Sequence, residues 1–247
     1  MNDPFQMQRE LRYGAPVCDH ILTGRYFTIG YSWYFRQAKW TLEIINREDY
    51  LLRDLDDVDR LNNFRADTRL PKRFRAGLGP FKGSGYDRGH MVASANQDLH
   101  EIQNSETFLL SNMSPQKPYF NRGIWQRLEA AIRVLNDRND ILETYVLTAP
   151  LFYFDKTVKT IEDTSDKYGI DVPIPHAFVK SVLAEDRRGK LSLWTFEMEN
   201  KMLQGKIEDY LVCTYDVEQI LGGRLWDRVN GGDLHLQKKT PRKIWKY

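Results

Sequence analysis

The stretch "GSGYDRGHMVASAN" (Gly83–Asn96) places an aspartate, an arginine and a histidine around a glycine, just before an apolar segment begins. The flanking glycines predict a turn or loop. A loop that only connected two elements would need neither Arg88 nor His90. A histidine in a polar, glycine-flanked loop reaches solvent and titrates near neutral pH, so His90 is a candidate general base. The other four histidines are predicted to be structural or surface residues: His176 follows Pro175 at a predicted strand start, and His20, His100 and His235 have no obvious charged partners.

A second polar cluster, "SNMSPQKPYFNRGIWQRLE" (Ser111–Glu129), runs into a predicted amphipathic helix over 121–140. Apolar residues at helical spacing predict one buried stripe: Ile124, Trp125, Leu128, Ile132 and Leu135. Asn121 lies at the helix start and Glu129 eight residues later, which puts the two within roughly 80° of each other around the helix. An asparagine at a helix start is either an N-cap or a ligand. The carboxylate two turns away favours a ligand without excluding the cap.

The bases of the 247-residue chain are unevenly distributed, although its net charge is only +2. The segment 60–90 contains eight bases and two acids, and the last eleven residues, "QKKTPRKIWKY", contain five bases and no acid. A basic segment that leads straight into "DRGH" suits a polyanionic substrate. The alternative is a solvated basic surface with no function.

The composition is that of a soluble globular protein, with 41% hydrophobic and 28% charged residues. No apolar run is long enough to span a membrane, and the N-terminus lacks the apolar core of a signal peptide. We therefore expect a cytoplasmic protein with no membrane partner; the alternative is a secreted or periplasmic protein whose signal has been removed. Cys18 and Cys213 form no CxxC pair, so they are either two buried thiols or one long-range disulfide.

Strand and helix signals alternate without a regular βαβ rhythm, which predicts an α+β fold with a largely antiparallel sheet. The segment 25–45 is predicted to be a hairpin with a Gly-Tyr-Ser turn, and 107–115 a short buried strand. The segments 176–186 and 190–198 predict a second hairpin. We expect a single domain over 13–230, with an N-terminal extension (1–12) and a basic C-terminal tail (231–247).

The succession of "GSGY", "DRGH", "SNMSPQ" and "NRGIWQRLE" resembles the DNA/RNA non-specific endonuclease family, which includes endonuclease G. Further segments resemble the family's framework: "YGAP" near Tyr13, "QAKWTLEII" near Trp40, "VLTAPLF" near Thr148 and "VPIPHAFVKSVL" near His176. The resemblance covers roughly 13–228. It implies a ββα-metal nuclease fold, in which helices flank a central antiparallel sheet, and a metal-dependent endonuclease that cuts DNA and RNA to 5′-phosphate and 3′-hydroxyl ends.

Taken residue by residue, the resemblance also implies a division of labour. His90 would be the general base, and Arg88 would bind the phosphate and stabilise charge in the transition state. Asn121 would be the one direct protein ligand of a single Mg²⁺, for which Mn²⁺ would substitute, and Glu129 would hold the ion through water. Asp87 would shape the loop.

Two further roles follow from the resemblance. Asn112 would support the site from the loop that precedes the helix carrying Asn121. The family's upstream arginine, expected to assist catalysis and bind substrate, would be Arg60 or Arg65; the spacing does not choose between them, and we favour Arg60. Family members are often homodimers, so the resemblance allows a homodimer. It equally allows a partner that is an inhibitor or regulatory protein.

Two other classes of function compete with this interpretation. One is a nucleic-acid-binding protein that has kept the fold without catalysis. The other is a phosphodiesterase specific for a small nucleotide. Filled catalytic positions argue against the first, and the basic approach to "DRGH" argues for a polymeric substrate.

Overall fold

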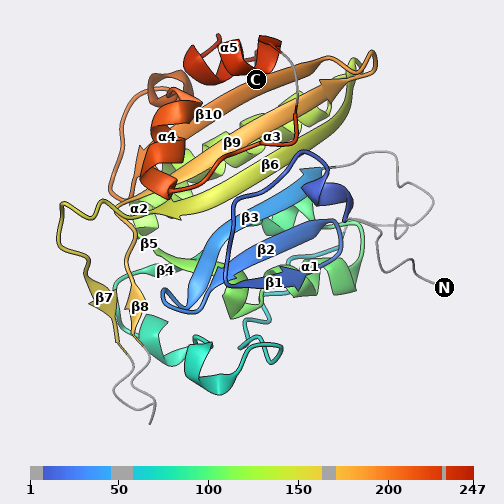
Figure 1. Cartoon of the computed structure of the whole chain (residues 1–247). Coiled ribbons are helices and arrows are strands. Elements are labelled where there is room, and N and C mark those ends of the chain that lie inside the picture. Colours follow the sequence, from blue (N-terminus) through green and yellow to red (C-terminus); the bar gives the residue numbers. More distant parts are fainter. Residues whose placement is uncertain (1–7, 46–57, 163–170, 230–231) are drawn as a thin grey trace.

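The computed structural model describes residues 8–45, 58–162, 171–229 and 232–247 (Figure 1). Its centre is a six-stranded sheet in the order β1-β2-β3-β6-β9-β10, and every pair of neighbours is antiparallel. This confirms the predicted α+β class with a largely antiparallel sheet. The strands of this sheet are β1 (His20–Thr23), β2 (Phe27–Ser32), β3 (Gln37–Ile45), β6 (Ile141–Leu151), β9 (Ala177–Asp186) and β10 (Leu191–Glu199).

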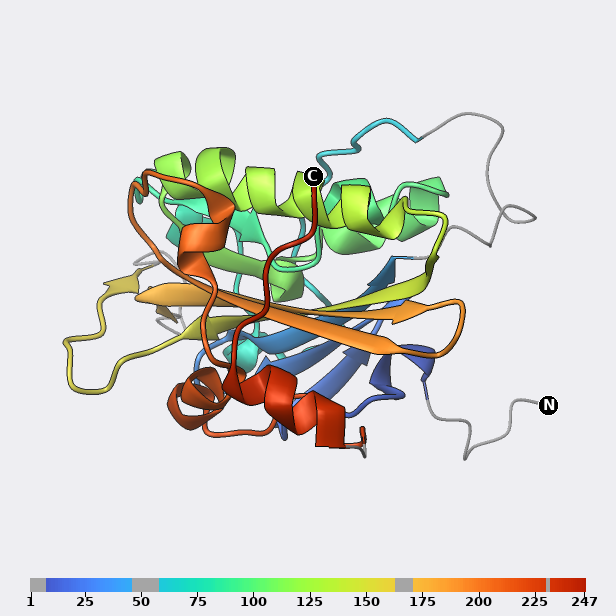
Figure 2. The ribbon, with the colours of Figure 1, turned by 90° about the horizontal axis from the view of Figure 1, so that it is seen from above.

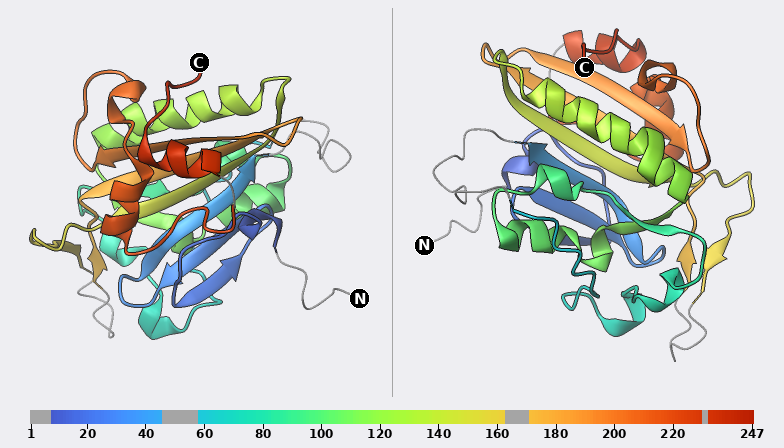
Figure 3. Two further views of the ribbon diagram at one scale, coloured as in Figure 1. Left: turned by 45° about the horizontal axis from the view of Figure 1, so that its top comes forward. Right: turned by 180° about the vertical axis from the view of Figure 1, so that it is seen from behind.

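Helices cover both faces of this sheet, so the strands are buried from two sides (Figures 2 and 3). One face carries α1 (Glu101–Thr107) and α3 (Gln126–Asn136), and the other carries α4 (Thr214–Leu221) and α5 (Gly232–Lys239). Each face has its own hydrophobic core. Coverage of both faces explains why residues along β3, β6 and β9 are almost continuously buried rather than alternately buried and exposed.

The predicted hairpin over 25–45 is confirmed by the pairing of β2 with β3. Its turn is at 33–36, however, and the predicted Gly-Tyr-Ser turn lies within β2. Position 30 requires a residue without a side chain, because a Cβ on Gly30 would come within 2.1 Å of the indole of Trp40 on β3. The predicted second hairpin is confirmed by the pairing of β9 with β10.

Two shorter sheets lie beside the central one. β4 (Asp87–His90) pairs with β5 (Met113–Gln116), and β7 (Thr160–Ile161) pairs with β8 (Val172–Pro173). The predicted strand over 107–115 is wrong in its first half. α1 ends at Thr107, and a 3₁₀ turn at Leu110–Asn112 precedes β5.

The predicted amphipathic helix is confirmed, and all five residues of its apolar stripe are buried. It begins with α2 (Pro118–Phe120) and continues through a π-helical turn, Asn121–Trp125, into α3. Gly123 has φ −108° and ψ −112° within this turn. Such π turns inside α-helices are frequent at functional sites.

The C-terminal segment packs on the fold. The buried indole of Trp245 donates a 2.8 Å hydrogen bond to the carbonyl of Ala131 on α3. Lys238, one of the predicted tail bases, is buried in an ion pair with Glu218 at 2.8 Å. Cys18 and Cys213 are free and half-buried, so the predicted alternative of a disulfide is wrong.

Candidate active site

The "DRGH" segment is strand β4, not the flexible loop that its glycines predicted. The glycines at positive φ, Gly83 (+73°) and Gly85 (+78°), make the turn that precedes it. Gly89 pairs with Ser114 of β5, and a Cβ on Gly89 would come within 2.2 Å of the Gln116 side chain. The strand therefore needs glycine at its third position because β5 approaches closely.

Side chains of a strand alternate between its two faces, so Arg88 and His90 lie on the same side of β4. Both contact Phe64: the Arg88 guanidinium carbon is 4.1 Å from the ring centre, and the His90 ring centre is 5.7 Å away. This alternation explains why an arginine and a histidine flank a glycine: both side chains pack against the same aromatic ring, Phe64.

His90 is enclosed by aromatic rings and is only 9% exposed. Phe64 and Phe108 both meet it edge to face, and the Phe108 ring centre is 4.9 Å away. The Nε2 atom of His90 is buried and has no hydrogen-bond partner among the described residues. Burial, followed by the positive charges of Arg60 and Arg88, lowers the pKa of His90 to about 3. The structure therefore predicts a neutral imidazole at physiological pH, in place of the titration near neutral pH expected from the sequence.

His90 lines a cleft of about 470 Å³ together with four other residues predicted from the sequence: Arg60, Arg88, Asn121 and Glu129. Asp87 lies in its wall, as does Arg133, which the sequence analysis missed. Arg133 is one helical turn beyond Glu129 and therefore lies on the same side of α3. Its position four residues after Glu129 was the feature of the sequence that could have identified Arg133 as a cleft residue.

Asn121 has helical backbone angles (φ −57°, ψ −49°) and is continuous with the helix on both sides. Its side chain caps no helix; its Nδ2 donates a 3.0 Å hydrogen bond to Oδ2 of Asp87 on β4. The alternative of an N-cap is therefore wrong. Because the amide nitrogen faces Asp87, the amide oxygen is the end available to a cation.

Asp87 joins the strand to the helix through two partners. Its carboxylate accepts the hydrogen bond from Asn121, and it forms an ion pair at 2.7 Å with Arg122 of the π turn. Asp87 therefore has structural contacts, as its predicted role implies, but these contacts hold the helix against β4 and do not shape a loop.

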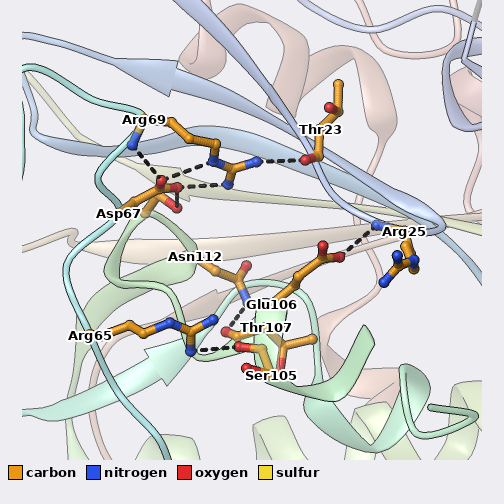
Figure 4. A network of polar contacts seen from close by, with 10 residues as sticks. Thr23, Arg25, Arg65, Asp67, Arg69, Ser105, Glu106, Thr107 and Asn112 are labelled. Atoms are coloured by element: carbon orange, nitrogen blue, oxygen red, sulfur yellow. Dashed lines mark hydrogen bonds and ion pairs between the residues drawn. The ribbon is translucent and has the colours of Figure 1, made fainter. Parts of the chain in front are cut away.

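The structure separates the two upstream arginines. Arg60 lies in the cleft, donates a 2.7 Å hydrogen bond to Ser94, and has its guanidinium 5.0 Å from the Phe108 ring centre. Arg65 lines a different surface hollow and donates to the backbone carbonyl of Asn63 and to that of Ser105, the latter shown in Figure 4. The geometry therefore favours Arg60 as the residue near His90.

Asn112 is fully buried and does not line the cleft. Its amide exchanges hydrogen bonds with the backbone of Val92 at 2.9 and 3.0 Å, and it also donates to the carbonyl of Thr107 (Figure 4). These bonds hold the chain that follows His90 against the turn before β5. Asn112 therefore contacts the backbone near His90 rather than the cleft.

Among the described residues, no group of three or more His, Cys, Asp or Glu side chains could cage a metal ion. The cleft instead offers the amide oxygen of Asn121 and the carboxylate of Glu129, while the carboxylate of Asp87 is paired with Asn121 and Arg122. Such a sparse, hard-oxygen donor set fits Mg²⁺, which keeps several waters and is bound by one or two protein oxygens together with substrate phosphates.

The buried, uncharged His90 predicts a specific pH dependence of stability. Its pKa is lower in the folded chain, about 3, than the 6.5 of an ordinary histidine, so between these pH values the unfolded chain binds more protons at this residue. Stability contributed through His90 therefore falls as the pH is lowered through this window. We expect the difference in unfolding free energy between wild type and His90→Gln to shift against the wild type by about 1.4 kcal/mol per pH unit below about pH 6.

Urea unfolding of both proteins at pH 7.5 and pH 5 measures this difference. All other titrating groups, including the buried Glu43, are shared by the two proteins and cancel. A difference that is the same at both pH values would show that His90 is as easily protonated in the folded state as in the unfolded chain.

Comparison with known proteins identifies several related nucleases. Mitochondrial endonuclease G of Homo sapiens is 31% identical over 85% of this chain and 71% of that protein, and nuclease C1 of Cunninghamella echinulata var. echinulata is 31% identical over 89% and 88%. An EndoG structure, solved in complex with EndoGI, superimposes with a TM-score of 0.80 at 30% identity, covering 90% of this chain and 91% of that one. The last comparison confirms the predicted fold.

The names of the relatives contradict the prediction of a cytoplasmic protein. Endonuclease G of Caenorhabditis elegans (29% identical over 83% of this chain and 67% of that protein), the human protein and a nuclease of Saccharomyces cerevisiae are all named as mitochondrial. No helix in the described part of the chain is long and apolar enough to cross a membrane.

The sequence model of one family, described as DNA/RNA non-specific endonuclease, matches residues 9–231. The match includes the strand that carries His90 and the helix that carries Asn121 and Glu129. The chain therefore belongs to the DNA/RNA non-specific endonuclease family and is a nuclease that hydrolyses phosphodiester bonds.

Proposed function

We propose that this nuclease is a Mg²⁺-dependent endonuclease that cuts both DNA and RNA and leaves 5′-phosphate and 3′-hydroxyl ends, with His90 as general base and a single ion held by Asn121. One observation carries the proposal: His90, whose buried Nε2 has no partner among the described residues, lines the same cleft as Asn121, Glu129 and several arginines. Buried polar atoms nearly always have a partner, so an unpaired one in a cleft calls for a ligand.

His90 would accept the proton of the attacking water. Only a neutral imidazole can do this, and burial beside Arg60 and Arg88 keeps His90 neutral. A bound phosphate would add negative charge next to these arginines, which makes the imidazole a stronger base when substrate is present.

Arg88 and Arg60 would neutralise charge on the phosphate. Each guanidinium packs on a phenylalanine ring, Arg88 on Phe64 and Arg60 on Phe108, and both rings also enclose His90. Preorganised donors near a reacting phosphate need no rearrangement as charge builds up in the transition state.

Asn121 and Glu129 would hold the ion, Asn121 directly through its amide oxygen and Glu129 through water. When bound, the ion would supply charge stabilisation to the phosphate and to the leaving 3′ oxygen. Members of this family are metal-dependent nucleases; that the metal is Mg²⁺ is the proposal here. The donor set of the cleft supports it.

Weak sequence preference follows from the kind of contact the cleft offers. Its charged residues suit phosphate oxygens, which carry no sequence information. A protein inhibitor is a proposed partner, because the similar EndoG was solved with EndoGI. A homodimer stays a prediction.

The first test concerns the metal. Purified protein should degrade plasmid DNA, single-stranded DNA and RNA in Mg²⁺ or Mn²⁺, and lose activity in chelator. Asn121→Ala should reduce turnover by more than about 100-fold, because even outer-sphere partners of a metal are typically worth 10–100-fold. Gel assays of cleavage across a Mg²⁺ series measure both effects.

Asn139→Ala, at an exposed position beyond the end of α3, is the matched control and should cleave at the wild-type rate. Full activity in chelator would contradict the metal mechanism. Degradation of mononucleotide diesters but not of polymers would favour the small-nucleotide phosphodiesterase. Binding without cleavage in any metal would favour the non-catalytic protein.

The second test concerns the base. His90→Ala should lower turnover by about 10²–10⁴-fold while leaving affinity for nucleic acid unchanged, because general-base catalysis acts only in the transition state. Added imidazole should restore part of the rate. His235→Ala, at an exposed histidine on α5, is the control. Wild-type turnover of His90→Ala would reduce "DRGH" to a structural strand.

The third test decides between the two upstream arginines. Arg60→Ala should lower turnover by about 10²-fold, the effect of removing one preorganised donor. Arg65→Ala should change turnover by less than about twofold, since it removes a surface side chain outside the cleft. Single-turnover cleavage of one oligonucleotide by both variants gives the comparison, and equal losses would contradict the assignment of Arg60.

A further inference from the structure

Lys180 lies in the middle of the central sheet, and its side chain is fully buried. It is paired with Thr148 of β6, to whose Oγ1 its ammonium donates a 3.0 Å hydrogen bond. The same Nζ is 4.4 Å from the ring centre of Trp125 and 3.6 Å from Oε1 of Glu129. Lysine is almost never fully buried unless its charge is paired. The position of Lys180 therefore depends on a carboxylate, and Glu129 supplies one.

Glu43 on β3 adds a second carboxylate to the polar layer that Lys180 and Glu129 form. It is buried and accepts 3.1 Å hydrogen bonds from the side-chain amides of Asn96 and Gln97. Burial raises the pKa of Glu43 to about 7, and the charge of Lys180 is the largest influence in the opposite direction. Lys180 is thus coupled to two carboxylates, one locked in the core and one that lines the cleft.

The two carboxylates differ in how they are held. Two amide hydrogen bonds fix Glu43, whereas Glu129 forms an ion pair with Lys180 and interacts electrostatically with Arg60. Asn96 extends the layer to the cleft wall, because its Oδ1 accepts a 3.0 Å hydrogen bond from Arg133. The layer lies between the sheet and the helix that carries Asn121 and Glu129.

We propose that Lys180 is a positioning residue that fixes the carboxylate of Glu129 at the floor of the cleft, while Thr148 and Glu43 hold Lys180 in place. The inference rests on the proposed function, because it gives Lys180 a role through Glu129. Lys180 itself lies outside the cleft lining, so its role would be indirect. Its loss would free Glu129 to turn away, so the metal-dependent rate would fall although every cleft residue is still present.

Lys180→Met, Glu129→Gln and the double variant test this by single-turnover cleavage of an oligonucleotide across a Mg²⁺ series. Methionine keeps the length of the side chain without the charge. Lys180→Met should lower the rate at limiting Mg²⁺ by about 10–100-fold and raise the half-saturating Mg²⁺ concentration, as expected for an outer partner of a metal site. Affinity for the oligonucleotide in chelator should be unchanged. In the Glu129→Gln background, Lys180→Met should change the rate by less than about threefold, since the two act as one unit.

Lys238→Met is the matched control, because it also removes a buried lysine from an ion pair with a glutamate. Its partner is Glu218 of α4, on the opposite face of the sheet from α3 (Figure 2). This variant should be less stable to urea, yet its rate per folded molecule and its half-saturating Mg²⁺ concentration should equal those of the wild type. The comparison separates positioning of Glu129 from a general loss of stability.

The outcomes distinguish the inference from the function on which it rests. If Glu129→Gln cuts like the wild type, the proposed role of Glu129 fails, and the inference fails with it. If Glu129→Gln is impaired but Lys180→Met keeps the wild-type Mg²⁺ dependence, or if the two losses multiply, the positioning role alone is overturned. Should Lys180→Met not fold, Thr148→Val decides: removing the acceptor of Lys180 should raise the half-saturating Mg²⁺ concentration at least about threefold, and no change would overturn the inference.

Discussion

The site depends on the contact between Asp87 on β4 and the helix segment that begins at Asn121. A 3.0 Å hydrogen bond from the Asn121 amide and an ion pair with Arg122 join a strand to a helix more than thirty residues away in sequence. The strand brings Arg88 and His90, and the helix brings Asn121 and Glu129. Without this contact neither element holds a complete site. It also sets which end of the Asn121 amide faces the cleft, and that end decides whether a cation has an oxygen to bind.

A second constraint is the surroundings of His90. Two phenylalanine rings and two arginines make protonation costly, so the imidazole is held uncharged in a basic cleft that is otherwise suited to anions. In the proposed mechanism, the arginines that would bind phosphate also disfavour protonation of the proposed base. A phosphate that neutralised them would make the imidazole more basic when a proton must be accepted. One arrangement would thus serve both substrate binding and proton transfer.

The sequence predicted much of this because local patterns report local structure. The apolar stripe of the helix, both hairpins and the α+β class follow from periodicity, and Asn121 and Glu129 follow from their spacing on one helix. The sequence did not predict which distant segments pair with one another. Glycines made "DRGH" resemble a loop, because the partner strand β5 and the close approach of Gln116 cannot be seen in the segment itself. The low pKa of His90, the choice of Arg60 over Arg65, and Lys180 beneath Glu129 all depend on contacts across elements. A lysine within the apolar run "HAFVKSVL" was the visible signal for the last of these.

The proposed mechanism requires one divalent ion at the amide oxygen of Asn121, beside a neutral, uncoordinated His90. Anomalous diffraction from crystals of the nuclease containing Mn²⁺ and an oligonucleotide with non-hydrolysable linkages would test it most directly. We expect a single Mn²⁺ peak at about 2.1 Å from Oδ1 of Asn121, with Glu129 reached through water and the His90 imidazole facing the phosphorus. A peak ligated directly by His90, or the absence of any peak at Asn121, would contradict it.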